Sequence, residues 1–114
     1  MESGKDYIFV YGLFRDQSKR MLGDCVYCGK SYVTGTLWKV NEFYPGWVSG
    51  KSGKVWGDIY LFDVSLLPQM DEYEGDEYKR VRVTTSSDIN CWLYEYQHAT
   101  TTFNQIKSGD WHLR

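Results

Sequence analysis

Short runs of β-branched and aromatic residues, separated by glycines and polar turns, constrain the fold of this chain more than any other feature of its sequence. Residues of this kind favour strands, and aromatic residues make up 18% of the chain, alongside 11 glycines. This composition is typical of a sheet closed around bulky side chains. The sequence therefore predicts five or six short strands, the clearest of them at residues 7–11, 30–40, 55–62, 79–85 and 91–97.

One segment between the predicted strands has the pattern of a helix. Asp63 or Ser65 can cap its start, Pro68 falls in the first turn, where a missing N–H does no harm, and Gly75 ends it. Residues 18–22 are expected to form a second, short helix. Apolar residues recur at helical spacing in the main helix, at Leu66, Leu67, Met70 and Tyr73.

These elements predict an α+β fold: a small, mostly antiparallel β-barrel with one main helix and a short second helix. A bulge or bend is expected at Gly35, and flexible turns are expected at 43–46 and 49–54. The 114 residues suffice for one hydrophobic core, so residues 1–114 are expected to form a single domain.

The charge balance excludes two classes of partner. The chain has 13 Lys+Arg against 15 Asp+Glu, a formal net charge of −2, whereas a nucleic-acid or anionic-membrane binder needs a basic surplus. No apolar run approaches the roughly 20 residues of a membrane-spanning helix. The polar residues 1–6 also argue against a secretory signal. We therefore expect neither a nucleic acid nor a membrane as partner.

The cysteines are informative about the cellular compartment of the protein but do not indicate a metal or redox site. Their number, three, is odd, which is typical of a reducing compartment, and a cytoplasmic location is expected. Cys25 and Cys28 have the CxxC spacing, but a closed zinc site needs four ligands. The other candidates, Cys91, His98 and His112, occur singly. The spacing therefore favours ordinary cysteines over a metal or redox site.

Five carboxylates crowd the C-terminal end of the main helix, where the helix dipole favours cations. Glu74 lies four residues after Met70 and so falls on the apolar stripe, whereas Asp71 and Glu72 lie mainly on the outer face. Burial beside like charges should raise the pKa of Glu74 and suit it to acid/base catalysis. An ordinary helix-end carboxylate that reaches solvent, or that pairs with Arg80 or Arg82, remains the alternative.

The loop after the first strand is the second unusual segment. Tyr11 and Gly12 are followed by Leu13 and Phe14, which are apolar where a turn is usually polar. Consecutive N–H groups that turn after a strand can form a concave anion site without a charged side chain. An ordinary strand-to-glycine turn is the alternative.

In this order and at this spacing, the segments resemble the gamma-glutamylcyclotransferase-like superfamily, which includes the AIG2-like proteins and the gamma-glutamylamine cyclotransferases. The family pattern has a Tyr-Gly-Ser/Thr-Leu loop, a Tyr-Pro-Gly segment, a Val-x-Gly-Glu-x-Tyr strand, Leu-Asp-x-x-Glu-Gly and Tyr-x-Arg. The counterparts here are FVYGLFR at 9–15, YPG at 44–46, VWGDIY at 55–60, MDEYEG at 70–75 and YKR at 78–80, followed by WLYEY at 92–96 and SGDW at 108–111. The resemblance covers nearly the whole chain.

The resemblance implies a reaction and a site. Glu74 would be the catalytic acid/base in the release of 5-oxoproline from a small gamma-glutamyl amine, amino acid or peptide. Neither cofactor nor metal would be needed, because the substrate's own α-amine attacks its γ-carbonyl. Substrate-binding residues would be the loop residues Tyr11, Gly12, Leu13 and Phe14, together with Tyr78 and Arg80.

The chain departs from the family pattern where Leu13 replaces a small hydroxyl residue and Phe14 follows it. A module that binds a small anionic metabolite in the same pocket without turnover is therefore the alternative function. A protein-interaction domain that uses exposed Trp47 and Trp111 is a third hypothesis. The sequence leaves open whether the chain is a monomer or a dimer.

Overall fold

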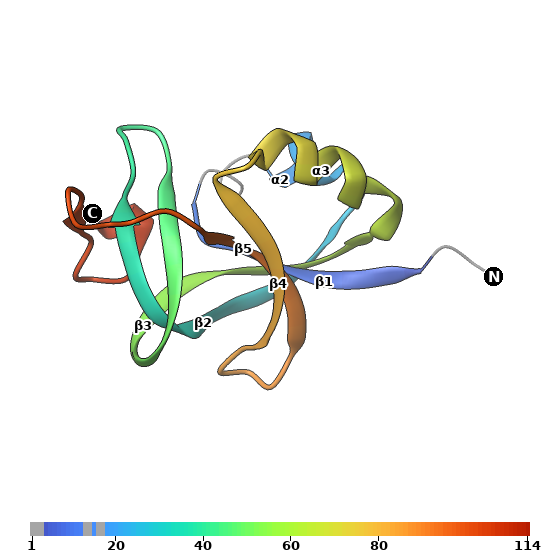
Figure 1. Ribbon diagram of the computed structural model, residues 1–114. Helices are drawn as coiled ribbons and strands as arrows, with labels where there is room; N and C mark the ends of the chain where they lie inside the picture. Colours follow the sequence, from blue (N-terminus) through green and yellow to red (C-terminus); the bar gives the residue numbers. More distant parts are fainter. Residues whose placement is uncertain (1–3, 13–14, 16–17) are drawn as a thin grey trace.

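The computed structural model describes residues 4–114 apart from 13–14 and 16–17. Its strands and helices follow in the order β1 (Lys5–Val10), α2 (Ser18–Leu22), β2 (Val26–Lys39), β3 (Pro45–Asp63), the 3-10 helix η1 (Val64–Leu66), α3 (Leu67–Glu74), β4 (Tyr78–Thr84), β5 (Asn90–Tyr96), β6 (Asn104–Gln105) and the 3-10 helix η2 (Trp111–Leu113). Figure 1 shows α2 and α3 on the same side of a curled sheet.

The sheet has six strands in the order β4-β5-β1-β3-β2-β6. Its pairs are antiparallel except for β1–β5 and a short contact between β3 and β5, which are parallel. Because β5 touches both β1 and the start of β3, at Trp47↔Glu95, the sheet curls into a half-barrel. The predicted α+β fold, a small and mostly antiparallel barrel with one main helix, is confirmed, and the barrel stays open along one side.

The β2–β3 hairpin corrects one expectation. Residues 49–54 were expected to form a flexible turn, but they belong to β3. The pairing passes from Thr34↔Lys54 directly to Gly35↔Ser49, so residues 50–53 protrude and the expected bulge at Gly35 is confirmed. Gly35 (φ +137) and Gly53 (φ +87) adopt left-handed conformations, and a Cβ on Gly53 would collide with the Gly35 carbonyl oxygen. Gly35 and Gly53 therefore allow β3 to continue through residues 49–54, where the sequence predicts a turn.

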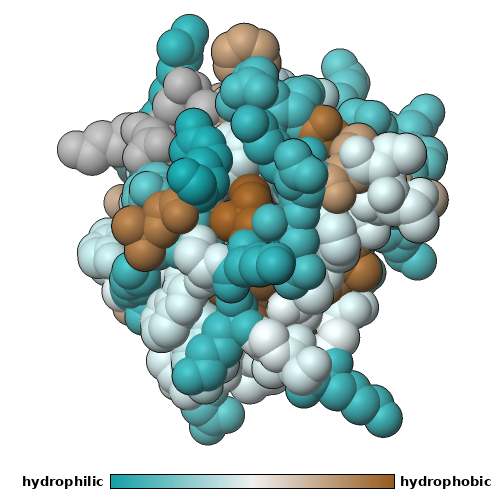
Figure 2. Space-filling model, turned by 90° about the vertical axis from the view of Figure 1, so that its left-hand side faces the viewer, coloured by the Kyte–Doolittle hydropathy of each residue, from teal (hydrophilic) through white to brown (hydrophobic). Residues whose placement is uncertain are grey.

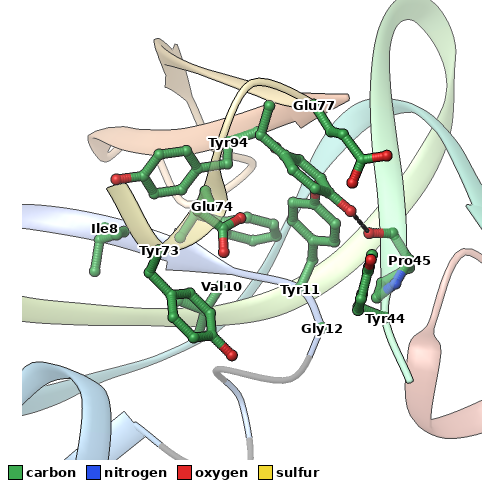
Figure 3. Close-up of a pocket in the computed structure, with 12 residues that line it drawn as sticks. Ile8, Val10, Tyr11, Gly12, Tyr44, Pro45, Tyr73, Glu74, Glu77 and Tyr94 are labelled. Atoms are coloured by element: carbon green, nitrogen blue, oxygen red, sulfur yellow. Dashed lines mark hydrogen bonds between the residues drawn. The ribbon is translucent and has the colours of Figure 1, made fainter. Parts of the chain in front are cut away.

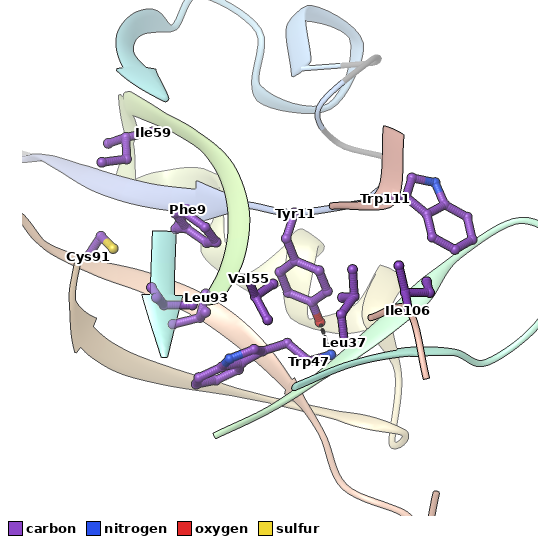
Figure 4. Close-up of a cluster of buried hydrophobic side chains, with 11 residues drawn as sticks. Phe9, Tyr11, Leu37, Trp47, Val55, Ile59, Cys91, Leu93, Ile106 and Trp111 are labelled. Carbon is purple, nitrogen blue, oxygen red and sulfur yellow. Dashed lines mark hydrogen bonds between the residues drawn. The ribbon is translucent and has the colours of Figure 1, made fainter. Parts of the chain in front are cut away.

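Alternating residues of β1 contribute to two hydrophobic cores, as the two-residue period of a strand requires. Phe9 points into the half-barrel, where it packs with Trp47, Val55 and Leu93 (Figure 4). On the opposite face, a second cluster joins β1 to the helices and β5 through Ile8, Val10, Leu22, Phe62, Met70 and Tyr94.

The cores contain two tryptophans that the interaction-domain hypothesis requires at the surface. Trp47 is 1% exposed and Trp111 is 3% exposed, so that hypothesis is wrong for these residues. The face in Figure 2 is mainly hydrophilic, with apolar side chains dispersed among polar ones. No helix in the described part of the chain is long and apolar enough to cross a membrane.

The main helix begins and ends as its sequence predicts. Asp63 caps η1 by accepting a hydrogen bond from the Ser65 N–H, and Pro68 lies in the first turn of α3. Gly75 ends α3 in a left-handed conformation (φ +72). Eight residues are too few for an isolated stable helix, so the burial of Met70 against the sheet fixes the position of α3.

Candidate functional site

A pocket of about 240 Å³ opens where the C-terminal end of α3 faces the end of β1 and the start of β3 (Figure 3). Its size suits a small metabolite, and it lies just below the usual range for ligand sites. Five tyrosines and two glutamates supply most of its polar atoms. The lining residues are Ile8, Phe9, Val10, Tyr11, Gly12, Tyr44, Pro45, Tyr73, Glu74, Glu77, Tyr78 and Tyr94.

Glu74 is the most unusual group in this pocket. Its carboxylate points into the cavity from the last residue of α3 (Figure 3). Burial raises the pKa of Glu74 to about 7. The expected direction is therefore found, and its cause is loss of hydration rather than repulsion by the neighbouring carboxylates. A carboxyl group in this state can both accept and return a proton near neutral pH.

The cations that sequence spacing offered to Glu74 bind elsewhere. Arg80 forms two hydrogen bonds with Asp71, at 2.9 and 3.0 Å, and Arg82 binds Asp6 at 2.6 Å. Among the residues that the structure describes, no side chain forms an ion pair with Glu74. Within the described residues, Glu74 therefore faces the pocket without an ion-pair partner.

Three tyrosines form a fixed wall around this carboxylate. The Tyr11 hydroxyl donates to the Tyr94 carbonyl at 2.7 Å and accepts from the Trp47 N–H at 3.1 Å. Tyr78 donates to the Pro45 carbonyl at 2.7 Å. Burial raises the pKa of each of these phenols, of Tyr94 as well as Tyr11 and Tyr78, and the Glu74 charge raises it further. The hydroxyls therefore stay protonated and hold the rings in place.

The end of β1 reaches the pocket because Gly12 has no side chain. A Cβ at Gly12 would lie 2.6 Å from Cδ of Pro45, closer than real contacts allow. The turn is held by a hydrogen bond from the Arg15 N–H to the Gly12 carbonyl at 3.0 Å. Arg15 is itself anchored to Asp58 at 3.1 Å and to Asp110 at 2.7 Å. Leu13 and Phe14, which the sequence assigned to substrate binding, lie outside the described residues.

Arg80, another expected substrate-binding residue, lies outside this pocket. Its guanidinium binds Asp71 and lies 4.4 Å above the Trp92 ring. Asp71 was expected mainly on the outer face, yet it also accepts a hydrogen bond from the Tyr94 hydroxyl at 2.7 Å. Arg80 therefore contacts the pocket wall only through Asp71 and Tyr94.

Several lining residues were missed as site residues by sequence reasoning. Tyr44 and Pro45 belong to a quoted family segment that was interpreted only as a turn, and Tyr94 was interpreted as one face of a strand. Tyr73 was assigned to the apolar stripe of the helix, but it is 57% exposed at the pocket. Glu77 was counted only among crowded carboxylates. For Tyr44, Pro45, Tyr73 and Tyr94, the usable signal is that they belong to the same family segments as Glu74 or to neighbouring ones; Glu77 lies outside these segments.

The described residues contain no group of three His, Cys, Asp or Glu side chains arranged to hold a metal ion. What the pocket offers is one uncompensated carboxylate with a pKa near neutrality, surrounded by tyrosines of fixed orientation. This arrangement can move a proton to and from a small ligand held against the end of β1.

Comparisons with known proteins agree with this geometry. A family model described as gamma-glutamyl cyclotransferase, AIG2-like, matches residues 8–113. A protein of Halalkalibacterium halodurans that bears the provisional name gamma-glutamylcyclotransferase is 31% identical over 91 residues, covering 72% of this chain and 82% of that protein.

Solved structures share the fold. The solution structure of the protein ytfP from Escherichia coli matches with a TM-score of 0.73 at 31% identity, covering 92% of this chain and 95% of that one. The crystal structure of an AIG2-like protein from mouse matches with a TM-score of 0.73 at 21% identity, covering 90% and 86% of the two chains.

Proposed function

The chain belongs to the gamma-glutamyl cyclotransferase, AIG2-like family, and we propose that it releases 5-oxoproline from a small gamma-glutamyl amine, amino acid or peptide. The observation that carries the proposal is the Glu74 carboxylate, which faces the pocket with a pKa of about 7. A cytoplasmic location is part of the proposal, because an odd number of cysteines, three, is typical of a reducing compartment.

In the proposed reaction, Glu74 accepts a proton from the substrate's α-ammonium group. The freed amine attacks the γ-carbonyl carbon of the same molecule and forms a five-membered ring. Glu74 then returns this proton to the leaving nitrogen as the amide C–N bond breaks. The ring nitrogen still has one hydrogen too many, and that second proton passes through the same carboxylate to the released amine, so the products are 5-oxoproline and an alkylammonium ion. The substrate carries its own nucleophile, and holding it in a bent conformation supplies a high effective molarity.

The remaining site residues have positioning roles in this proposal. Main-chain N–H groups of the loop from Gly12 through Leu13 to Phe14 hold the gamma-glutamyl group and the developing oxyanion. Tyr11 and Tyr78 shape the cavity that bends the substrate. Arg80 acts indirectly, by holding Asp71, which in turn fixes Tyr94 through the contacts described above.

The direct test is release of 5-oxoproline from a panel of gamma-glutamyl amines, amino acids and peptides. Glu74→Gln keeps the size of the side chain but cannot accept a proton, so turnover should fall about 10²–10⁴-fold. The matched control is Glu72→Gln, two residues away along the chain and exposed to solvent. Binding without any 5-oxoproline from the wild type would replace the enzyme by a metabolite-binding module.

The pH profile provides a second test. Because Glu74 must be ionised to accept the proton, kcat/KM of the wild type should rise with pH through about 7 and level off above it. A profile that is flat between pH 5 and 8 would contradict the role of Glu74 as the base.

A further inference from the structure

Arg15, in the segment that follows β1, is a buried cation held between two carboxylates, and none of the three side chains lines the pocket. Its Nε donates to Asp58 at 3.1 Å and its Nη1 donates to Asp110 at 2.7 Å. Resting on the proposed function, we infer that Asp58 and Asp110 are positioning residues for the reaction. Through Arg15 they hold the loop that begins at Gly12, where the developing oxyanion is bound, so the C-terminal turn controls turnover from outside the pocket.

This ion network is the most buried one that the described residues form. The side chains of Arg15 and Asp110 are 4% and 5% exposed. Burying such charges costs hydration, and an apolar cluster of similar volume often stabilises a fold as well or better. What a guanidinium between two carboxylates adds is a single geometry, because its N–H groups have fixed directions. The network therefore suits the orientation of a backbone segment.

The backbone of Arg15 connects this network to the pocket. The Arg15 N–H donates to the carbonyl of Gly12, which lines the pocket, at 3.0 Å. Because the guanidinium is bound at two points, the residue has little freedom to move, and the Gly12 carbonyl is held with it. In the proposed reaction this loop supplies the main-chain donors, and a displacement of about 1 Å at a reacting centre can cost about 10²-fold in rate.

The two carboxylates come from distant parts of the chain and are themselves held in place. Asp58 belongs to β3 and Asp110 precedes η2, 43 and 95 residues away from Arg15 in the sequence. The second oxygen of Asp58 accepts from the Tyr27 hydroxyl at 3.3 Å. Asp110 caps η2 by accepting from the His112 N–H at 2.9 Å. Both acceptors are therefore oriented before any ligand binds.

The C-terminal turn that carries Asp110 is fixed to β3. The Gly109 carbonyl accepts from the Trp56 N–H at 2.7 Å. A Cβ at Gly109 would collide with the Lys54 carbonyl oxygen, so the turn lies directly against the strand. On the other side of Asp110, Trp111 is buried in the hydrophobic core (Figure 4). Asp110 therefore stands between two anchored neighbours and transmits their position to Arg15.

The test compares Asp110→Ala and Asp58→Asn with the wild type, on the substrate that the wild type converts fastest. Each variant should lower kcat about 10–100-fold and leave KM within about threefold, because oxyanion donors act mainly in the transition state. The rise of kcat/KM through pH about 7 should stay in place, because the surroundings of Glu74 are unchanged. The double variant should cost no more than the worse single variant, because both carboxylates act through one guanidinium.

Asp6→Ala is the matched control. It deletes a carboxylate that also binds an arginine, Arg82 at 2.6 Å, but lies in the first turns of β1 away from the lining residues. All proteins are assayed well below their melting temperatures, so a loss of stability alone leaves kcat unchanged. A kcat within about threefold of the wild type in Asp110→Ala and Asp58→Asn overturns the inference, and so does a loss that Asp6→Ala reproduces. A rise in KM alone, or a shifted pH profile, also overturns it.

Failure of the proposed function has a different signature. If no substrate yields 5-oxoproline, the reaction is overturned, and hydrogen exchange of backbone amides decides the inference alone. The Arg15 amide should exchange at least about tenfold faster in Asp110→Ala than in the wild type. The Gly75 amide, which donates to the Asp71 carbonyl at the end of α3, should exchange at the same rate in both proteins. An Arg15 amide that keeps its wild-type exchange rate overturns the inference.

Discussion

Glu74→Gln should stabilise the folded protein at alkaline pH, although it should strongly reduce turnover. Burial moves the pKa of Glu74 from its ordinary value of 4.5 to about 7. Between these two values the folded protein binds more protons than the unfolded chain, so the free energy of unfolding falls as pH rises through this window. Each pH unit is worth about 1.4 kcal/mol, which gives a penalty of at most about 3.5 kcal/mol above pH 7.

Glutamine carries no charge, so the variant escapes this penalty. Urea denaturation of the wild type and the variant at pH 5 and at pH 8 measures it, because all other titrating groups are common to both proteins and cancel in the comparison. We expect Glu74→Gln to be more stable than the wild type by about 2–3 kcal/mol at pH 8 and almost equal to it at pH 5.

Glu72→Gln provides the control, since the exposed Glu72 should show no such pH-dependent difference. The reasoning is refuted if Glu74→Gln is less stable than the wild type at pH 8, or if the difference is the same at both pH values. Either result would mean that the Glu74 carboxylate is hydrated or paired with a cation in the folded protein.

Three further substitutions test the contacts that hold the pocket. Asp71→Asn should lower the free energy of unfolding, measured by urea denaturation, by about 1–2 kcal/mol. A double-mutant cycle with Tyr94→Phe should show coupling, because the Tyr94 hydroxyl donates a hydrogen bond to Asp71, and additive effects of the two substitutions would contradict this. Arg15→Met should cost about 3–5 kcal/mol in the same assay, because it leaves Asp58 without its cation and leaves the buried Asp110 with only the more exposed Lys30, at 3.5 Å; a cost below about 1 kcal/mol would refute that role. Gly12→Ala should lower kcat/KM as well as the melting temperature, because the new methyl group displaces Pro45 at the pocket; a fully active variant would show that this close approach is dispensable.

Local patterns in the sequence are enough to place the main elements. The aromatic run at 7–11 predicts β1 to within two residues, and the capping residue Asp63 and Gly75 bracket the helical region as found. These features depend on the period of side chains along one element and on the backbone preferences of single residues. For the same reason, the spacing between Met70 and Glu74 is enough to direct that carboxylate toward the buried side of α3.

The sequence could not predict which partner each charged group binds. Arg80 stands within reach of both Asp71 and Glu74 along the chain, and the pairing of β4 with β5 places its guanidinium over Trp92 and beside Asp71. As a result, neither Arg80 nor Arg82 pairs with Glu74. Which carboxylate an arginine binds depends on the positions of strands that are distant in sequence, so the local periodicity of one element cannot predict it.

The pocket itself is also a product of tertiary structure. Tyr44 and Pro45 appear in the sequence as a turn, and they become part of the wall because β3 packs its first residues against Gly12. The sequence of residues 50–53 likewise predicts a turn. In the structure these residues belong to β3, because Gly53 packs closely against Gly35 of the neighbouring strand. The sequence alone determined where β1, β4, β5 and the helical region lie and which face of α3 carries the acid/base candidate. The tertiary structure decided what surrounds that carboxylate, because burial and the exclusion of cations arise only when distant segments pack together.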